Sequence, residues 1–175
     1  LQVNQQLKNY FDTKVQGVPD YYVAFAQMIN KSWGELKSQL NPTKVSALES
    51  LFTSWGKRKM AKVWAVPFNY NAGFTRLKSV MAEQFISDIY SQMTKIANIA
   101  KGLDTNSIEY ASALNLRDTL QTNLTEVLGF HIKLPAPELL NDWDFGMQPN
   151  GEIDYGVNRR IQATLFQSAF STFGE

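Results

Sequence analysis

Hydrophobic residues recur at three- and four-residue intervals along most of the chain, and the most regular pattern covers residues 72–103. At about 100° per residue, such positions fall on one side of a helix. The apolar arc is wide, which is typical of a helix covered on several sides. The pattern therefore predicts a long central helix around which the other helices pack. Its apolar positions are Phe74, Leu77, Met81, Phe85, Ile89, Met93, Ile96, Ala100 and Leu103.

Five further stretches show helical periodicity and are bounded by helix-start and helix-stop residues. Asn41 and Pro42 form a typical N-cap and first helical residue. Residues 104–107 offer several N-caps, and Gly129 is a typical helix end because glycine accepts the left-handed conformation. We expect these helices at 2–16, from Pro19 to about Leu40, from 42 to about 64, from a cap within 104–107 to about Leu128, and at about 156–173.

Glycine and proline residues allow two positions for the ends of some predicted helices. Gly34 lies inside the second helical pattern and weakens it, because glycine is unfavourable in a helix interior. The third helix either pauses at Gly56 or continues until Pro67 stops it. Residues 66–71 are then the connection to the central helix, with Asn71 as its cap.

From Phe130 onward the pattern changes from helical to extended. Residues 130–134 alternate with period two and are followed by Pro135 and Pro137, which predicts extended chain or a lone edge strand. The turn formers and large aromatic side chains that follow predict a loop packed on the helices. The fold class predicted is all-α: a single domain over 1–175, with about six helices around the long one and an aromatic-rich loop at 130–155.

Amide side chains outnumber basic side chains in this sequence. Asn and Gln number 25, against 17 Lys and Arg, and charged residues make up only 19% of the chain. Uncharged polar groups cost less to desolvate than charges do. This composition favours a surface that contacts other proteins, as extracellular and virion proteins do.

Bulk properties exclude several classes of site. The net charge of +1 provides no global field for nucleic acid or acidic membranes. The absence of cysteine removes disulfides, thiolate nucleophiles and cysteine metal ligands. No apolar run approaches the roughly eighteen residues of a membrane span. Because the sequence begins with Leu1, we expect a mature product or a fragment of a longer chain.

One local concentration of positive charge lies between Trp55 and Trp64. Cations interleaved with aromatic residues can bind phosphates and stack on bases, which makes this cluster a candidate nucleic-acid site. The alternative is that these cations end a helix, where they favour the negative end of its dipole. The basic cluster consists of Lys57, Arg58, Lys59 and Lys62.

Residues capable of catalysis or metal binding do not form a recognisable motif. His131 is the single histidine and lies in the extended segment, where we expect it to point away from its apolar neighbours. Asp142 and Glu152 fit a calcium loop poorly, since glycine falls at its fifth place and Glu152 at the eleventh. We therefore expect no metal, cofactor or catalytic residues.

Arg117 projects into the apolar arc of the fifth helix, where an unpaired cation is costly to bury. Either it pairs with a carboxylate such as Asp88 or Asp144, or its head group reaches the surface, and the second alternative is favoured.

Three functional hypotheses follow from these patterns. The leading one is a non-catalytic structural or assembly protein whose surface mediates self-association or binding to another protein, such as a coat-type subunit of a particle. The second is a nucleic-acid-binding protein that uses the basic cluster. The third is a small-molecule pocket or enzyme on the 130–155 loop, which requires Asp142, Asp144, Glu152 or His131 to converge in a cleft.

Overall fold

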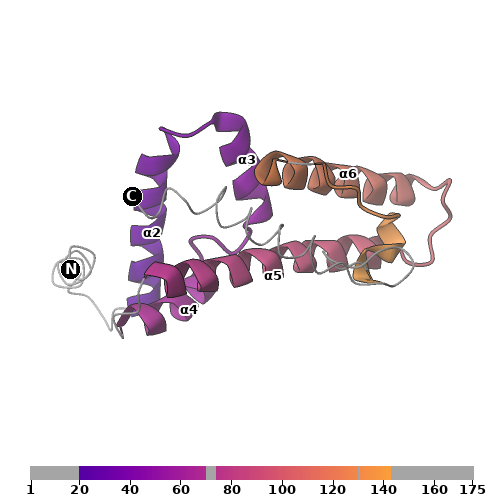
Figure 1. Cartoon of the computed structure of the whole chain (residues 1–175). Helices are drawn as coiled ribbons and strands as arrows, with labels where there is room; N and C mark the ends of the chain where they lie inside the picture. Colours follow the sequence, from indigo (N-terminus) through magenta and orange to yellow (C-terminus); the bar gives the residue numbers. More distant parts are fainter. Residues whose placement is uncertain (1–19, 70–73, 130, 143–175) are drawn as a thin grey trace. The chain divides into compact units, whose positions relative to one another are not determined.

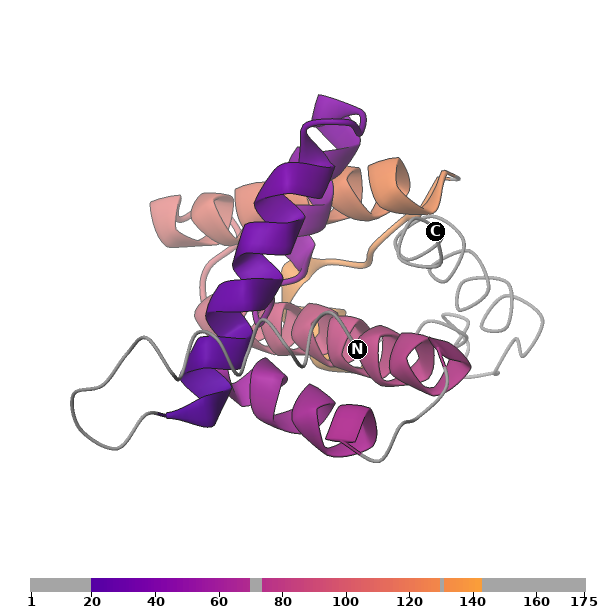
Figure 2. The same cartoon turned by 90° about the vertical axis from the view of Figure 1, so that its left-hand side faces the viewer.

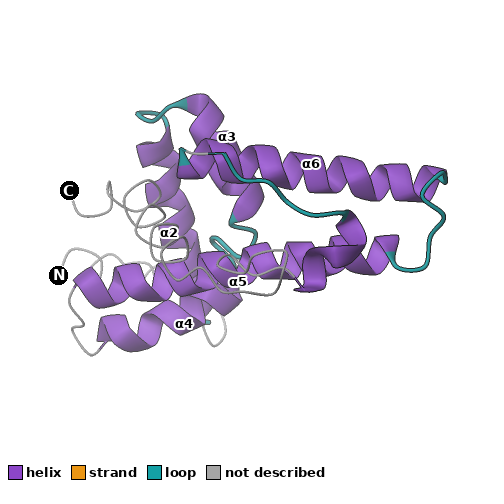
Figure 3. Ribbon diagram, turned by 45° about the vertical axis from the view of Figure 1, so that its right-hand side comes forward, coloured by secondary structure: helices purple, strands orange, loops and turns teal. Residues whose placement is uncertain are grey.

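The computed structural model describes residues 20–69, 74–129 and 131–142, and this part of the chain is all-α (Figure 1). Coloured by secondary structure, the same residues show helices and loops only (Figure 3). The helices predicted at 2–16 and 156–173 lie outside the described residues. The described elements are α2 (Tyr21–Lys37), α3 (Pro42–Leu51), α4 (Arg58–Asn69), α5 (Phe74–Ala100), α6 (Ile108–Leu128) and the 3-10 helix η1 (Pro137–Asp142).

The chain divides into two compact units that are described separately below. Unit 1 comprises Leu1–Pro42 and Ser54–Met81, and unit 2 comprises Thr43–Thr53 and Ala82–Glu175. Helix α5 contributes its first residues to unit 1 and the rest to unit 2. The single domain over 1–175 stays a prediction.

Unit 1 is built on the packing of α2 against α4, which Figure 2 shows from a second side. Asp20 caps α2, because its carboxylate accepts hydrogen bonds from the N–H groups of Tyr22 and Val23 at 3.0 and 3.3 Å. The shared core is made of small residues around one ring, so the two helix backbones can approach closely. Its buried members are Ala24, Phe25, Ala26 and Ala61.

The turn between α3 and α4 explains why the third predicted helix is divided. Gly56 has a φ of +71°, a left-handed conformation that interrupts a right-handed helix. The Asn30 side-chain amide on α2 donates to the Gly56 carbonyl at 3.0 Å, which anchors the turn within unit 1. The predicted helix is therefore divided, as one of the two alternatives has it, but α3 already ends at Leu51, so residues 52–57 separate the two helices and the break is wider than a pause at Gly56.

Other helix boundaries differ from the prediction. Helix α2 begins at Tyr21 and ends at Lys37, so it is shorter than predicted, but it continues unbroken through Gly34. Pro67 was predicted to stop a helix, and this is wrong, since α4 extends to Asn69. A proline near a C-terminus removes only one late backbone hydrogen bond, and α4 ends two residues after it. Asn71, predicted to cap the central helix, lies outside the described residues.

The predicted apolar positions of α5, called here its apolar ridge, are buried where they belong to unit 2. Phe85, Ile89 and Met93 are at most 1% exposed. Phe85 packs edge-to-face on Phe52, which follows α3, with ring centroids 5.2 Å apart. The Gln92 side-chain amide donates to the carbonyl of Leu51, the last residue of α3, at 2.9 Å. Helix α3 is thereby held against α5 by both apolar and polar contacts.

Helix α6 begins and ends where the sequence predicts. The Ser107 hydroxyl accepts from the N–H of Tyr110 at 3.1 Å, and Ser107 is the N-cap. Gly129 ends the helix in the left-handed conformation, with φ +75°. The predicted stop at Gly129 is therefore confirmed, and the N-cap is the last of the four cap residues that the sequence offers.

The segment 131–136 that follows α6 has no regular secondary structure. Its side chains nevertheless alternate as predicted: Ile132 and Leu134 are buried, whereas His131 and Lys133 are exposed. The segment is therefore extended chain and not an edge strand. Of the predicted loop over 130–155, residues 137–142 form η1, and the rest lies outside the described part.

Candidate functional site

The basic cluster lies at the start of α4, and its four side chains are all exposed. Lys57 occupies the N-cap position, since its carbonyl accepts from the N–H of Ala61 at 3.1 Å. A helix N-terminus carries partial positive charge, so the dipole there disfavours nearby cations. The explanation that these cations end a helix and stabilise its negative end is therefore wrong.

Arg58 differs from the lysines of the cluster because it has partners within unit 1. Its Nε donates to the Asp20 carboxylate at 2.8 Å, and its guanidinium carbon lies 5.2 Å from the centroid of the Tyr22 ring. The hydrogen bond from Arg58 holds the pKa of Asp20 below its usual value. Arg58 thus connects the first residues of α2 and α4, while Lys57, Lys59 and Lys62 extend into solvent.

The tryptophans that flank the cluster are packed against protein. The Trp55 and Trp64 rings lie edge-to-face with centroids 5.6 Å apart, and both indole nitrogens are buried. Trp33 packs on Trp55 in the same way at 5.7 Å. Trp64 also packs against the small-residue core of α2 and α4. Their contacts are those of core residues, so the stacking part of the nucleic-acid hypothesis loses its support.

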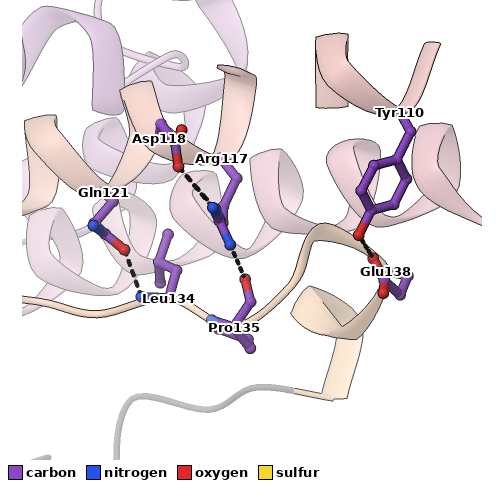
Figure 4. A network of polar contacts seen from close by, with 7 residues as sticks. All are labelled: Tyr110, Arg117, Asp118, Gln121, Leu134, Pro135 and Glu138. Carbon is purple, nitrogen blue, oxygen red and sulfur yellow. Dashed lines mark hydrogen bonds and ion pairs between the residues drawn. The ribbon is translucent and has the colours of Figure 1, made fainter. Parts of the chain in front are cut away.

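A second polar arrangement joins α6 to the segment that returns along it (Figure 4). The Gln121 side-chain oxygen accepts from the Leu134 N–H at 2.8 Å. The Thr125 hydroxyl accepts from the Ile132 N–H at 3.2 Å. These bonds satisfy backbone donors that have no ladder partner, at the two residues whose side chains enter the core. Side chains of α6 therefore replace the neighbouring strand that an extended segment usually needs.

Arg117 belongs to the same arrangement. Its Nη1 donates to the Pro135 carbonyl at 3.2 Å, and it pairs with Asp118, the next residue on α6, at 2.9 Å. The side chain is 22% exposed, so it is neither deeply buried nor free at the surface. The less favoured alternative, pairing with Asp88, is wrong, because the partners of Arg117 are Asp118 and the Pro135 carbonyl; Asp144 lies outside the described residues.

The arrangement ends where η1 meets the first turns of α6. The Tyr110 hydroxyl donates to the Glu138 carboxylate at 2.6 Å. This hydrogen bond raises the pKa of Tyr110 and lowers the pKa of Glu138. The Arg117 charge, which acts on both groups, also favours the ionised form of Glu138.

We expect Tyr110→Phe to destabilise the protein at neutral pH and to have a smaller effect at both pH extremes. The lowered pKa of Glu138 contributes stability that is lost as the pH falls below about 4. The raised pKa of Tyr110 contributes stability that is lost as the pH rises above about 10. Urea titrations of the wild type and the Tyr110→Phe variant between about pH 3 and 11 measure the difference in free energy of unfolding. A difference that does not change with pH would contradict the role given to the hydrogen bond between Tyr110 and Glu138.

The remaining candidate residues form no metal-binding cluster within the described part of the chain. His131 is exposed, as predicted for an extended segment. Among the described residues, no three His, Cys, Asp or Glu side chains are grouped closely enough to hold a metal ion. Asp144 and Glu152 lie outside those residues, so the third hypothesis keeps its status as a prediction.

Sequence reasoning missed the polar side chains of α6 that hold the returning segment. Their spacing contains a signal: Tyr110, Arg117, Gln121 and Thr125 are separated by seven, four and four residues, which places them on one helix face. Polar residues on the buried side of a helix require partners. The period-two segment immediately downstream has backbone donors that require acceptors.

No protein-family model, curated protein or solved structure that we compared with the chain matches it. Within the described residues, none of the helices combines the length and the hydropathy that crossing a bilayer requires. The class of protein therefore has to be inferred from the contacts and surfaces of this chain alone.

Proposed function

We propose that the protein is non-catalytic and acts by self-association through its exterior, as a coat-type or other particle-forming subunit would. The polar side chains described above support this proposal, because they hold segments of the chain together. Gln121, Thr125 and Arg117 bind the returning segment, and Asp20 binds Arg58. Polar side chains that already bind other segments of the chain are poorly placed to bind a substrate.

The observation that carries the proposal is the exposure of large apolar side chains in unit 2. Ile108 is 87% exposed, although most isoleucines are buried. Moving one such side chain out of water is worth about 1.5–3 kcal/mol. Four large apolar residues remain exposed in the described part of unit 2: Ile99, Ile108, Leu116 and Leu139.

The proposal includes the finer architecture predicted from the sequence. In it, about six helices pack around the long helix at 72–103, so that the apolar ridge is internal and the exterior is available to partners. The enclosure of Phe85 and Ile89 supports the internal ridge. The first and last helices of this arrangement, at 2–16 and 156–173, are predicted from their hydrophobic spacing alone.

Nucleic-acid binding remains a second candidate because of the basic cluster. Lys57, Lys59 and Lys62 are exposed cations at the start of a helix, where the helix dipole adds to their attraction for anions. Because Trp55 and Trp64 pack on each other, nucleic acid would be bound here through its phosphates and not by stacking of its bases.

Sedimentation velocity over a range of protein concentrations tests the proposal, with absorbance recorded at 260 and 280 nm. We expect species larger than the monomer, and we expect Ile108→Ser to reduce their proportion. Val23→Ser is the matched control, since Val23 is an exposed apolar residue of unit 1, 38% exposed. A monomer at every concentration would contradict self-association, and co-sedimenting 260 nm absorbance would favour the second candidate.

A further inference from the structure

The small net charge of the chain conceals a separation of charge between the two units. The described residues of unit 1 contain eight Lys and Arg but only two acidic residues, a net charge of +6. The described residues of unit 2 contain five Lys and Arg and nine acidic residues, a net charge of −4. Two parts of one chain with opposite charge can attract each other in different molecules.

Two of the eight cations of unit 1 lie on one exposed face of α4. Lys59 and Lys62 lie three residues apart, and Val63 lies four residues after Lys59, so the three share one helix face. Val63 is 43% exposed, whereas Met60 and Ala61 on the other side of the helix are fully buried. The α4 face therefore consists of two exposed lysines and an exposed valine.

The exposed face of α6 has the opposite charge. Ile108 and Leu116 are exposed there, and Glu109 and Glu126 lie toward its two ends. The only cation on α6 is Arg117, which is engaged by Asp118 and the Pro135 carbonyl. Asp118, which is also exposed and lies between the two acids, pairs with Arg117. The other exposed residues of α6 are uncharged: Ala111, Ser112, Asn115, Thr119 and Thr122.

We propose that the α6 face of one molecule docks against the α4 face of a second copy of the same chain. This inference rests on the self-association proposed above and identifies the surfaces that carry it. Each face combines exposed apolar side chains with charges of one sign, and the signs are opposite. Uncharged hydroxyl and amide groups along α6 lower the cost of desolvating the rest of the face.

This contact joins two different surfaces, so it is heterologous. Each molecule keeps one free α4 face and one free α6 face after its first contact. Further copies therefore add head to tail, and the assembly grows into a ring or a filament. Because the charges are exposed, association is expected to weaken as salt rises and the Debye length falls below about 8 Å.

Charge reversal on each face separates this inference from other modes of association. One variant combines Lys59→Glu with Lys62→Glu, and the other combines Glu109→Lys with Glu126→Lys. Each variant alone has two faces of the same sign and is expected to be at least tenfold weaker in self-association than the wild type. An equimolar mixture restores opposite signs at both contacts and is expected to recover assembly.

Lys31→Glu with Lys37→Glu, and Glu49→Lys with Glu83→Lys, are the matched controls, because each pair also reverses two exposed charges of one unit outside the two faces. Sedimentation velocity gives the size of each species, and circular dichroism confirms the helical content of each variant. Recovery in the mixture cannot come from misfolded protein, so it distinguishes lost charge pairing from lost folding.

Several results would overturn the inference. Either variant alone assembling like the wild type would show that its face is not used, as would a mixture that stays monomeric. If the lysine variant only releases nucleic acid while its assembly is unchanged, the α4 face is a phosphate-binding surface. A wild type that is monomeric throughout would refute self-association itself, whereas an assembling wild type that ignores charge reversal refutes only these surfaces.

Discussion

Phe85→Ala is expected to lower the free energy of unfolding by about 3–5 kcal/mol, because it deletes a fully buried aromatic side chain and leaves a cavity. The ring also packs edge-to-face on Phe52, and this contact contributes beyond the buried area. Urea titration followed by circular dichroism measures the change. A loss of this size is a large part of the total stability of a typical domain.

Ile99→Ala is the matched control on the same helix. Ile99 is 45% exposed, so its truncation removes less buried surface and should cost less than about 1 kcal/mol. Equal losses for the two variants would show that the predicted ridge of α5 is not enclosed. The comparison therefore tests the central element of the predicted architecture at one buried and one exposed position.

The α5 ridge could be predicted because its signal is local and repeated. Phe85, Ile89 and Met93 are spaced by four residues, and all three are buried as the spacing predicts. The boundaries of α6 were predictable for a similar reason. The Ser107 cap and the Gly129 stop act within one helical turn of their own positions.

The division of the third predicted helix depends on contacts that are distant in the sequence. A glycine in a helical pattern is compatible with a helix or a turn. The turn that forms here includes a hydrogen bond from Asn30, 26 residues away, to the Gly56 carbonyl. No local pattern contains that information.

The polar arrangement on α6 was hidden for the same physical reason. Taken alone, Arg117 has several plausible carboxylate partners, and the sequence favoured a surface position for its head group. Its partners are the neighbouring Asp118 and a backbone carbonyl, that of Pro135. Every residue has such a carbonyl, so backbone partners leave little trace in side-chain identity.

Variants in each unit also test the prediction of a single domain. Phe85 belongs to unit 2 and Gly56 to unit 1. If the units unfold cooperatively, substitutions at both positions shift one shared transition. If they unfold independently, each substitution shifts only the transition of its own unit.

Gly56→Ala is expected to destabilise the protein by about 2 kcal/mol, through two effects that can be separated. The left-handed backbone conformation, φ +71°, costs an alanine about 1–2 kcal/mol. A Cβ at this position would also collide with the Asn30 side-chain amide. Asn30 can move away, but it then loses its hydrogen bond to the Gly56 carbonyl, worth about 0.5–1.5 kcal/mol.

Control glycines distinguish these effects. Gly102 and Gly129 also have positive φ, but a Cβ at either would meet nothing within 4 Å. Their alanine variants should therefore show the cost of conformation alone. Gly34 lies inside a helix, and a Cβ there would meet nothing within 4 Å. Gly34→Ala should therefore stabilise the protein by about 0.5–1 kcal/mol.

A double-mutant cycle then isolates the contact between Asn30 and Gly56. Asn30→Ala removes both the hydrogen bond and the collision, so Gly56→Ala in that background should cost no more than Gly102→Ala. The two substitutions together should be less destabilising than the sum of their separate effects. Strict additivity would show that Asn30 does not hold the turn, and the pause between α3 and α4 would then need another cause.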